Sequence, residues 1–271
     1  MQSVRYEPCI LLQPFVECYI FARNLTKDSP PLRDKFIPSG GEGLVFHFED
    51  PFSIYSENRK DLLPKSFFVG QAKKFLLIES GRIVDSIIIK LKPAGFYNLF
   101  SHSACELSNI SCIDAIDIQG YEIEMIYEQM AYETDTKRIA IIERYLIQKL
   151  RQNSHLQNNK ISFAVDYIIA NKGCLKIEAL YELTNSGERT FQRDFQKHVG
   201  ISAKALARLI RVNNIIRESQ KGVVDWFNVI CQYGYFDQAH LIHDFKYVTG
   251  ETPTLFFGKD LTQTRFISAS F

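Results

Sequence analysis

The hydrophobic positions of this 271-residue chain change their period near Pro93. Before that point, short segments rich in β-branched and aromatic residues alternate with turn-rich stretches. This spacing favours an antiparallel sandwich or barrel over a parallel sheet. Strands are expected at Val16–Phe21, Gly43–Phe48, Phe52–Tyr55, Lys74–Ile78 and Val84–Leu91. The first part of the chain is therefore predicted to be β-rich and barrel- or sandwich-like.

After Pro93 the apolar positions recur with the period of a helix. Trailing helices are expected at Gly95–Phe100, Tyr121–Tyr132 and Thr136–Gln152. The last of them carries one apolar stripe, made of Ile139, Ile142, Leu146 and Leu150. That stripe can pack on the sheet of its own chain or form an isologous contact with a second copy, and the pattern leaves both open.

A polar run at residues 152–160 (QNSHLQNNK) has almost nothing to bury and is the best candidate for a linker. Beyond it the pattern is almost entirely helical. Helices are expected at Ser162–Ala170, Lys176–Leu183, Glu188–Val199, Ser202–Gln220, Val224–Gln232 and Asp237–Thr249. The predicted class is α+β, with a β-rich domain at 1–152, a linker at 153–160 and an all-α domain at 161–259.

Part of the helical region occurs twice. The stretch FQRDFQKHVGISAKAL (191–206) recurs in outline as LIHDFKYVTGETPTLF (241–256), so that Gly200 corresponds to Gly250. Each copy has an apolar helix face, a glycine that can adopt positive φ, and a Ser or Thr that can cap the next helix. Such a repeat predicts paired helix-turn-helix units, and these favour DNA as the partner.

Charge supports this interpretation only in combination with the repeat. The net charge is +1, yet residues 186–221 hold eight Lys or Arg against three Asp or Glu. Phosphate binding needs such a local surplus of positive charge. By itself, however, a surplus of this kind more often marks a helix face that is exposed to solvent. The expected helix Ser202–Gln220 would span roughly 28 Å, close to the ~34 Å between successive major grooves. It could therefore hold two reading helices in adjacent grooves.

Two segments resemble the helix-turn-helix units of AraC/XylS-type bacterial transcription regulators. They are SGERTFQRDFQKHVGIS (186–202) and GYFDQAHLIHDFKYVTGETP (234–253), within a resemblance that covers roughly 161–257. The second has a glycine and an aromatic, then D-Q, F-K and G-x-x-P. The N-terminal part resembles, more weakly, the sensing and dimerisation domains of this family. The resemblance implies a homodimeric activator that binds double-stranded DNA and recruits RNA polymerase.

Carried over position by position, the resemblance implies seven base-contacting residues. They are Arg189, Gln192 and Arg193 in the first unit, and Gln238, Ala239, His240 and His243 in the second. Arginine can pair with guanine and glutamine with adenine. A neutral histidine cannot make the bidentate pair of arginine, and Asp244 beside His243 repels phosphate, so the first unit is expected to discriminate more. Asp244 also has a structural explanation, because it repeats Asp194.

No catalytic constellation, metal site or cofactor motif emerges from the sequence, and we do not expect an enzyme. His47 and Glu49, in VFHFED, are expected on one exposed strand face without a third ligand. Six cysteines lack any C-x-x-C pair, and no signal peptide or membrane span is evident. A cytoplasmic protein is therefore expected.

The function of the β-rich domain has two interpretations. Its many aromatic residues could line a pocket for a small-molecule effector, or they could simply form its core. The main hypothesis is a regulator with an effector-sensing or dimerisation domain. The alternative is an effector-independent DNA-binding protein whose N-terminal domain serves only for oligomer or partner assembly.

Overall fold

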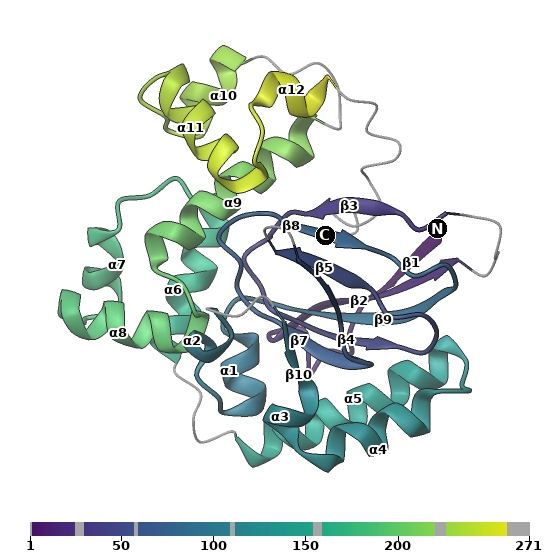
Figure 1. Ribbon diagram of the computed structural model, residues 1–271. Helices are drawn as coiled ribbons and strands as arrows, with labels where there is room; N and C mark the ends of the chain where they lie inside the picture. The colour runs from purple at the N-terminus through teal and green to yellow at the C-terminus, as the bar shows by residue number, and fades with distance from the viewer. Residues whose placement is uncertain are drawn as a thin grey trace.

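The computed structural model describes residues 2–24, 30–56, 59–108, 112–153, 159–219 and 226–258, and all structural statements refer to these ranges. Strands dominate the first ninety residues and helices the remainder (Figure 1). The two parts are built on separate hydrophobic clusters, with a few N-terminal residues reaching into the helical one. The predicted α+β class is confirmed.

Two antiparallel sheets face each other and do not close into a barrel in the described part of the chain. The larger sheet consists, in order, of β1 (Gln2–Tyr6), β2 (Val16–Asn24), β9 (Val84–Leu91), β4 (Gly43–His47), β7 (Ser66–Val69) and β10 (Cys112–Asp114). The smaller sheet consists of β3 (Arg33–Phe36), β8 (Leu76–Glu79), β5 (Ser53–Ser56) and β6 (Arg59–Leu62). Apolar side chains from both sheets, among them Val45, Phe52 and Phe67, form the core between them.

Helices cover the other face of the larger sheet. They are α1 (Gly95–Phe100), α2 (Ala104–Ser108), α3 (Ala115–Gln119), α4 (Tyr121–Met130) and α5 (Asp135–Gln152). The apolar stripe of α5 packs into this layer, with Ile142 and Leu146 fully buried. Of the two possibilities left open by the sequence, the stripe therefore packs on its own chain, and it is not available to a second copy.

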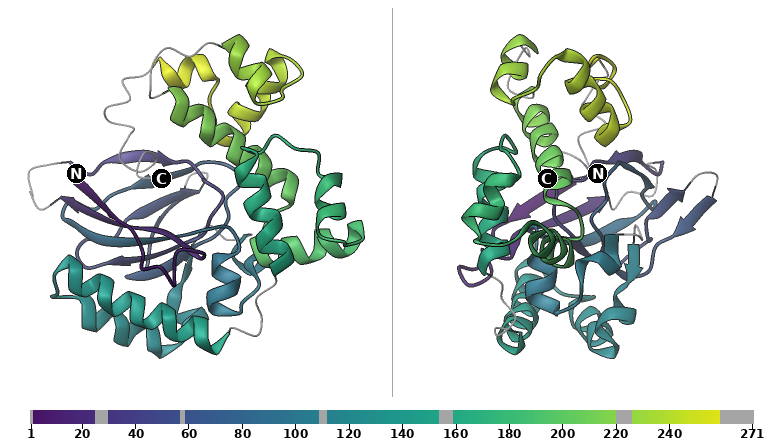
Figure 2. Two further views of the ribbon diagram at one scale, coloured as in Figure 1. Left: turned by 180° about the vertical axis from the view of Figure 1, so that it is seen from behind. Right: turned by 90° about the vertical axis from the view of Figure 1, so that its left-hand side faces the viewer.

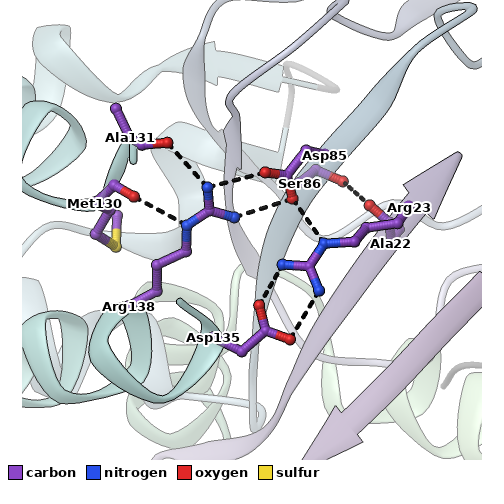
Figure 3. Close-up of polar contacts among 8 residues, drawn as sticks. All are labelled: Ala22, Arg23, Asp85, Ser86, Met130, Ala131, Asp135 and Arg138. Atoms are coloured by element: carbon purple, nitrogen blue, oxygen red, sulfur yellow. Dashed lines mark hydrogen bonds and ion pairs between the residues drawn. The ribbon is translucent and has the colours of Figure 1, made fainter. Parts of the chain in front are cut away.

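Buried polar contacts fix α5 to the larger sheet (Figure 3). Arg138, which is almost fully buried, donates to the carboxylate of Asp85 on β9 at 2.9 Å and to the carbonyls of Met130 and Ala131. Arg23 on β2 bridges Asp85 and Asp135. The four charges neutralise one another, so a helix of mixed composition is held in one register on the sheet.

The C-terminal part contains α6 (Asn159–Ala170), α7 (Glu178–Leu183), α8 (Glu188–Val199), α9 (Ala203–Ser219), α10 (Trp226–Gln232), α11 (Gln238–Thr249) and α12 (Pro253–Phe257). The 17-residue helix α9 runs from one group of helices to the other over about 25 Å (Figures 1 and 2). One hydrophobic cluster extends along it through both groups. Tyr233 belongs to this cluster and Trp226 and Ile230 pack against it, while the side chain of Phe227 lies outside the described part.

One prediction for the β-rich part is wrong. His47 was expected on an exposed strand face with Glu49, but it is 1% exposed, and only Glu49 reaches solvent. The imidazole of His47 packs between the rings of Phe52 and Phe67, with centroid distances of 4.7 and 5.2 Å. The face of β4 that carries His47 looks into the space between the two sheets, so alternation along one strand did not reveal that a second sheet covers it.

Candidate DNA-binding surface

The first helix-turn-helix unit presents polar side chains on one face of α8. Arg189, Gln192 and Arg193 are all exposed, whereas Phe191 and Phe195 on the opposite face are buried. A spacing of three and four residues places the polar three on neighbouring turns of one face. Their contacts are within their own unit: the amide of Gln192 donates to Glu188 at 3.0 Å, and the guanidinium of Arg193 pairs with Asp194 at 3.1 Å. Both pairs lie at the surface, where DNA could replace them.

The second unit has the same geometry with different chemistry. Asp237 caps α11 by accepting a hydrogen bond from the backbone N–H of His240 at 2.7 Å. The four positions expected to contact bases, Gln238, Ala239, His240 and His243, are exposed on the first two turns of the helix. The ring of His240 stands edge-on against Tyr235 at 5.1 Å. In place of the arginines of α8, this face therefore offers an amide and two imidazoles.

Asp244 lies on the inner side of α11 and is 1% exposed. Its carboxylate pairs with Arg208 at 2.9 Å and with Arg211 at 3.4 Å, both from α9. These two arginines also lie over the rings of Tyr247 and Tyr235. Both belong to the positive surplus of residues 186–221, but their guanidinium groups are directed to Asp244, and only 24% and 16% of their side chains are exposed. They hold the second reading helix to the connecting helix, which confirms the structural explanation of Asp244.

The exposed positive charge is therefore smaller than the sequence count suggests. Arg208 and Arg211 are used internally, and Lys221 lies outside the described residues. The cations that remain on the surface of the first unit and of α9 are Arg189, Arg193, Lys197, Lys204 and Arg217. This surplus lies nearer to the first unit than to the second.

One exposed residue was not among the candidates from the sequence. Phe236 is 91% exposed and directly precedes the capping residue Asp237. In the sequence it lies within the segment 234–253, where no role was assigned to it. Its place directly before the start of the helix could have singled it out, because the N-terminal residues of a recognition helix contact base edges.

Each unit also touches the β-rich part at its glycine turn. Gly200 and Gly250 have φ of +82° and +78°, and each N–H bonds the carbonyl four residues back, as the repeat predicted. Gly200 lies against the backbone of Ala104 on α2, and Gly250 lies against the ring of Phe75 just before β8. The ends of both reading helices are therefore packed on the N-terminal part.

Further contacts reinforce each of these two junctions. At α8, the rings of Tyr97 and His198 meet at 3.9 Å, and the thiol of Cys105 donates to the carbonyl of Gln196 at 3.0 Å. At α11, the backbone N–H of Phe75 donates to the carbonyl of Val248 at 2.9 Å, and Lys35 pairs with Glu251. The two units are thus held by different parts of the β-rich region, the first by α1 and α2 and the second by β3 and β8.

Across the described ranges, no group of three His, Cys, Asp or Glu side chains is placed to hold a metal ion. No helix within those ranges is long and apolar enough to cross a membrane. The polar face of α8 combines exposure, positive charge and the predicted spacing, whereas that of α11 presents exposed polar side chains without an arginine.

Comparison with known families identifies the C-terminal part. This part of the chain contains a helix-turn-helix domain. More specifically, residues 180–259, which match a family described as a helix-turn-helix domain, form an AraC-type domain that contains both units described above. Residues 4–114 match a second family, described only as a domain of unknown function. The chain has no significant match among curated proteins.

The arrangement of elements is similar to that in structures of ToxT from Vibrio cholerae. A 1.65 Å structure of ToxT has a TM-score of 0.46 and 10% identity, over 88% of this chain and 98% of that chain. A complex of ToxT with (E)-4-(8-methylnaphthalen-1-yl)but-3-enoic acid has a TM-score of 0.47 and 10% identity, with the same coverage. Wild-type ToxT bound to an unsaturated fatty acid has a TM-score of 0.45 and 10% identity, over 88% and 94% of the two chains.

Proposed function

We propose that this regulator reads a specific DNA sequence with both helix-turn-helix units of one chain. The observation that carries the proposal is the exposure of all seven candidate side chains on α8 and α11, the two helices that end in matching glycine turns. Arg189, Gln192 and Arg193 would supply most of the discrimination, because arginine and glutamine make bidentate pairs with guanine and adenine.

The second unit would mainly contact the DNA backbone and so position the protein on its site. Its readout of the bases, from Gln238, His240 and His243 and from the backbone of Ala239, would be weaker. The exposed ring of Phe236 adds an apolar contact of the kind that recognises a thymine methyl group. Because Arg208 and Arg211 are engaged with Asp244, they would contribute no phosphate contact of their own. The second half of the bound site should therefore be the more tolerant of substitution.

The domain organisation supports a division of labour along the chain. We propose a sensing or dimerisation domain at 1–152, a linker at 153–160 and a DNA-binding domain at 161–259. As an activator the protein would act as a homodimer and recruit RNA polymerase beside its site. The docking of both reading helices on α1, α2, β3 and β8 supports control of DNA binding from the N-terminal part, since a ligand that alters those elements alters both junctions.

The alternative is an effector-independent protein whose N-terminal domain only assembles partners. An effector-sensing regulator and an effector-independent protein differ in their response to small molecules. An effector that binds the folded chain raises its melting temperature in a concentration-dependent manner, whereas an assembly domain shows no such ligand. Melting scans of the full chain against a library of small metabolites, with and without DNA, would separate them.

The experiment that tests DNA reading is selection of bound sequences from a random library by the full chain. Arg193→Ala is compared with wild type, and Arg59→Ala, on the edge strand β6, serves as a control of equal charge change. The expected result is a site with two major-groove segments about one turn apart, relaxed at one segment only by Arg193→Ala. Sequence-blind, salt-sensitive binding by the wild type would contradict the proposal.

A further inference from the structure

A small cavity lies between the two sheets of the N-terminal part. It has a volume of about 70 Å³, and most of its wall is apolar, including Phe36, Val45, Phe52 and Phe67. A cavity that holds benzene measures ~150 Å³, so this space would admit an apolar body of about three to five carbons. Its size alone does not indicate a ligand.

The polar groups in the wall give the cavity its chemistry. Glu42 lines it, is 1% exposed, and has no hydrogen-bond partner on either carboxyl oxygen. Gln71 lies beside Glu42, and its amide nitrogen donates to the carbonyl of Gly40. The two carboxyl oxygens of Glu42 are thus buried acceptors at the cavity, and such groups are costly to leave unsatisfied.

Burial raises the pKa of Glu42 from its ordinary 4.5 to about 8, so a bound cation would favour its ionised form. The buried cation in the same wall is already paired. Lys90 also lines the cavity, but its ammonium pairs with Glu17 at 3.0 Å. The missing complement at this site is therefore a group rich in N–H donors.

We propose that this cavity binds a small primary amine, with its ammonium group on Glu42 and its apolar body among the aromatic side chains. An ammonium group carries three donors and no acceptor, which suits the two unpaired carboxyl oxygens of Glu42. This inference rests on the proposed function, because it names the chemical class of the effector that the regulator would sense.

The walls of the cavity lead directly to the DNA-binding domain. Phe36 and Leu76 line the cavity, and their neighbours Lys35 and Phe75 contact the end of α11. The segment before β4 also contributes to the wall, through Gly41. Figure 1 places β3 and β8 on the side of the sandwich that faces the second unit.

Two contacts from that segment reach α9. Gly40 lies against Leu206 and Ile210, and the amide of Asn213 donates to the carbonyl of Pro38 at 2.9 Å. An amine that expands the cavity would therefore displace residues that touch both the connecting helix and the second reading helix. Binding of the amine is expected to change DNA affinity, because the two states of this wall present different surfaces to α9 and α11.

The test uses the full chain and three probes of similar size: n-butylammonium, butyrate and n-butanol, at equal ionic strength. Binding is measured by calorimetry and by the shift in melting temperature. Butylammonium is expected to bind at least tenfold more tightly than the other two. Equal or tighter binding of butyrate would overturn the proposal in favour of recognition by Lys90, and equal binding of butanol would overturn it in favour of apolar filling.

Two variants assign the binding to the proposed group. Glu42→Gln keeps the shape and removes the carboxylate, and it is expected to weaken butylammonium binding at least tenfold. Glu49→Gln, an exposed carboxylate beyond the end of β4, is the matched control and should bind as wild type does. Unchanged affinity in Glu42→Gln would overturn the site.

The effect of the amine on DNA binding is measured in a separate experiment. DNA affinity is first measured without amine, which tests the proposed function alone, and then with saturating butylammonium. A several-fold change in wild type that is absent in Glu42→Gln supports the effector role. No change despite measured amine binding would overturn that role, and the DNA-binding function would stand on its own measurement.

Discussion

The two helix-turn-helix units share one backbone plan but fix their reading helices differently. Helices α8 and α11 have twelve residues each and end in a glycine of positive φ. In α11, Asp244 is buried and pairs with Arg208 and Arg211. In α8, the corresponding Asp194 lies nearer the surface, where it pairs with the exposed Arg193.

This difference shows which positions of a sequence repeat stay the same in both copies and which can change. Both copies keep the apolar helix face and the glycine turn, because these determine the angle between the helices. The charged positions are free to diverge. The second unit uses two arginines of α9 to hold its helix in place, whereas the first keeps its arginines at the surface. The same aspartate is thus a structural anchor in one unit and a surface partner in the other.

The most sensitive test of this contrast is to remove the two aspartates one at a time. Asp244→Ala leaves two largely buried arginines without a counter-charge, and we expect it to lower the free energy of unfolding by about 3 kcal/mol. Asp194→Ala removes one surface pair and should cost less than about 1 kcal/mol. Urea denaturation of both variants measures the difference. Equal losses would contradict the distinct roles of the two residues.

Substitution of the glycine in each turn should lower the free energy of unfolding by a similar amount in the two units. Alanine at Gly200 or Gly250 must adopt positive φ, and its Cβ would lie 2.8 Å from the Ala104 carbonyl or 2.1 Å from the Phe75 ring. Each variant is expected to lose about 2 kcal/mol of unfolding free energy. Gly187→Ala is the control, because its φ is −65° and nothing lies within 4 Å of the added atom.

A second substitution then separates the two turns. Phe75→Ala removes the ring that a Cβ at position 250 would meet, so Gly250→Ala should cost about 1 kcal/mol less in that background. The neighbour of Gly200 is backbone, and no side-chain change can relieve it. If Phe75→Ala rescued neither or both variants, the proposed packing of the two turns on different parts of the N-terminal region would be wrong.

The sequence predicted best those elements that are bounded by residues with special conformations or buried on both sides. The bounds of β9, α1 and α8 were predicted without error. Of the strands that were missed, β1, β3, β6 and β10 are all edge strands. An edge strand buries few side chains, so it leaves no hydrophobic pattern to detect. The remaining missed strand, β7, is a short buried run without alternation, which periodicity cannot assign.

The candidate site shows the same limit. Exposure of the residues on α8 and α11 could be predicted, because it follows from helical period within one element. The partners of Asp244 could not, since Arg208 and Arg211 lie more than thirty positions away on another helix. The burial of His47 was missed for a similar reason, because the sheet that covers it is contributed by other strands. Contacts between elements require the fold.

DNA binding should reveal a smaller but directional difference between the units. Arg193→Ala is expected to weaken specific binding by roughly 1–2 kcal/mol, through loss of a bidentate base contact. His243→Ala and Gln238→Ala should each cost less, because these side chains make weaker contacts. Fluorescence titrations at one salt concentration give the comparison. A greater loss in either second-unit variant than in Arg193→Ala would reverse the proposed division of readout.

The smallest expected effect concerns the junction of the first unit. His198, whose counterpart in the repeat is Val248, packs against Tyr97 with the two rings tilted by 49° and is buried. Burial lowers its pKa below the ordinary 6.5, although a hydrogen bond to the carbonyl of Asp194 opposes the shift. A group whose pKa is lowered by folding adds stability above pH 6.5, and that stability is lost as the pH falls through the folded-state value.

Acidification should therefore weaken the first unit through His198. We compare wild type with His198→Val, which copies the second unit into the first, by urea denaturation at pH 7.5 and pH 5.0. Wild type is expected to lose more unfolding free energy between the two pH values than His198→Val does, since only wild type must bury a charged imidazole or unfold around it. An identical loss in both proteins would mean that Tyr97 and His198 can separate without cost. The α1–α8 junction would then be the weaker of the two attachments between the β-rich part and the reading helices.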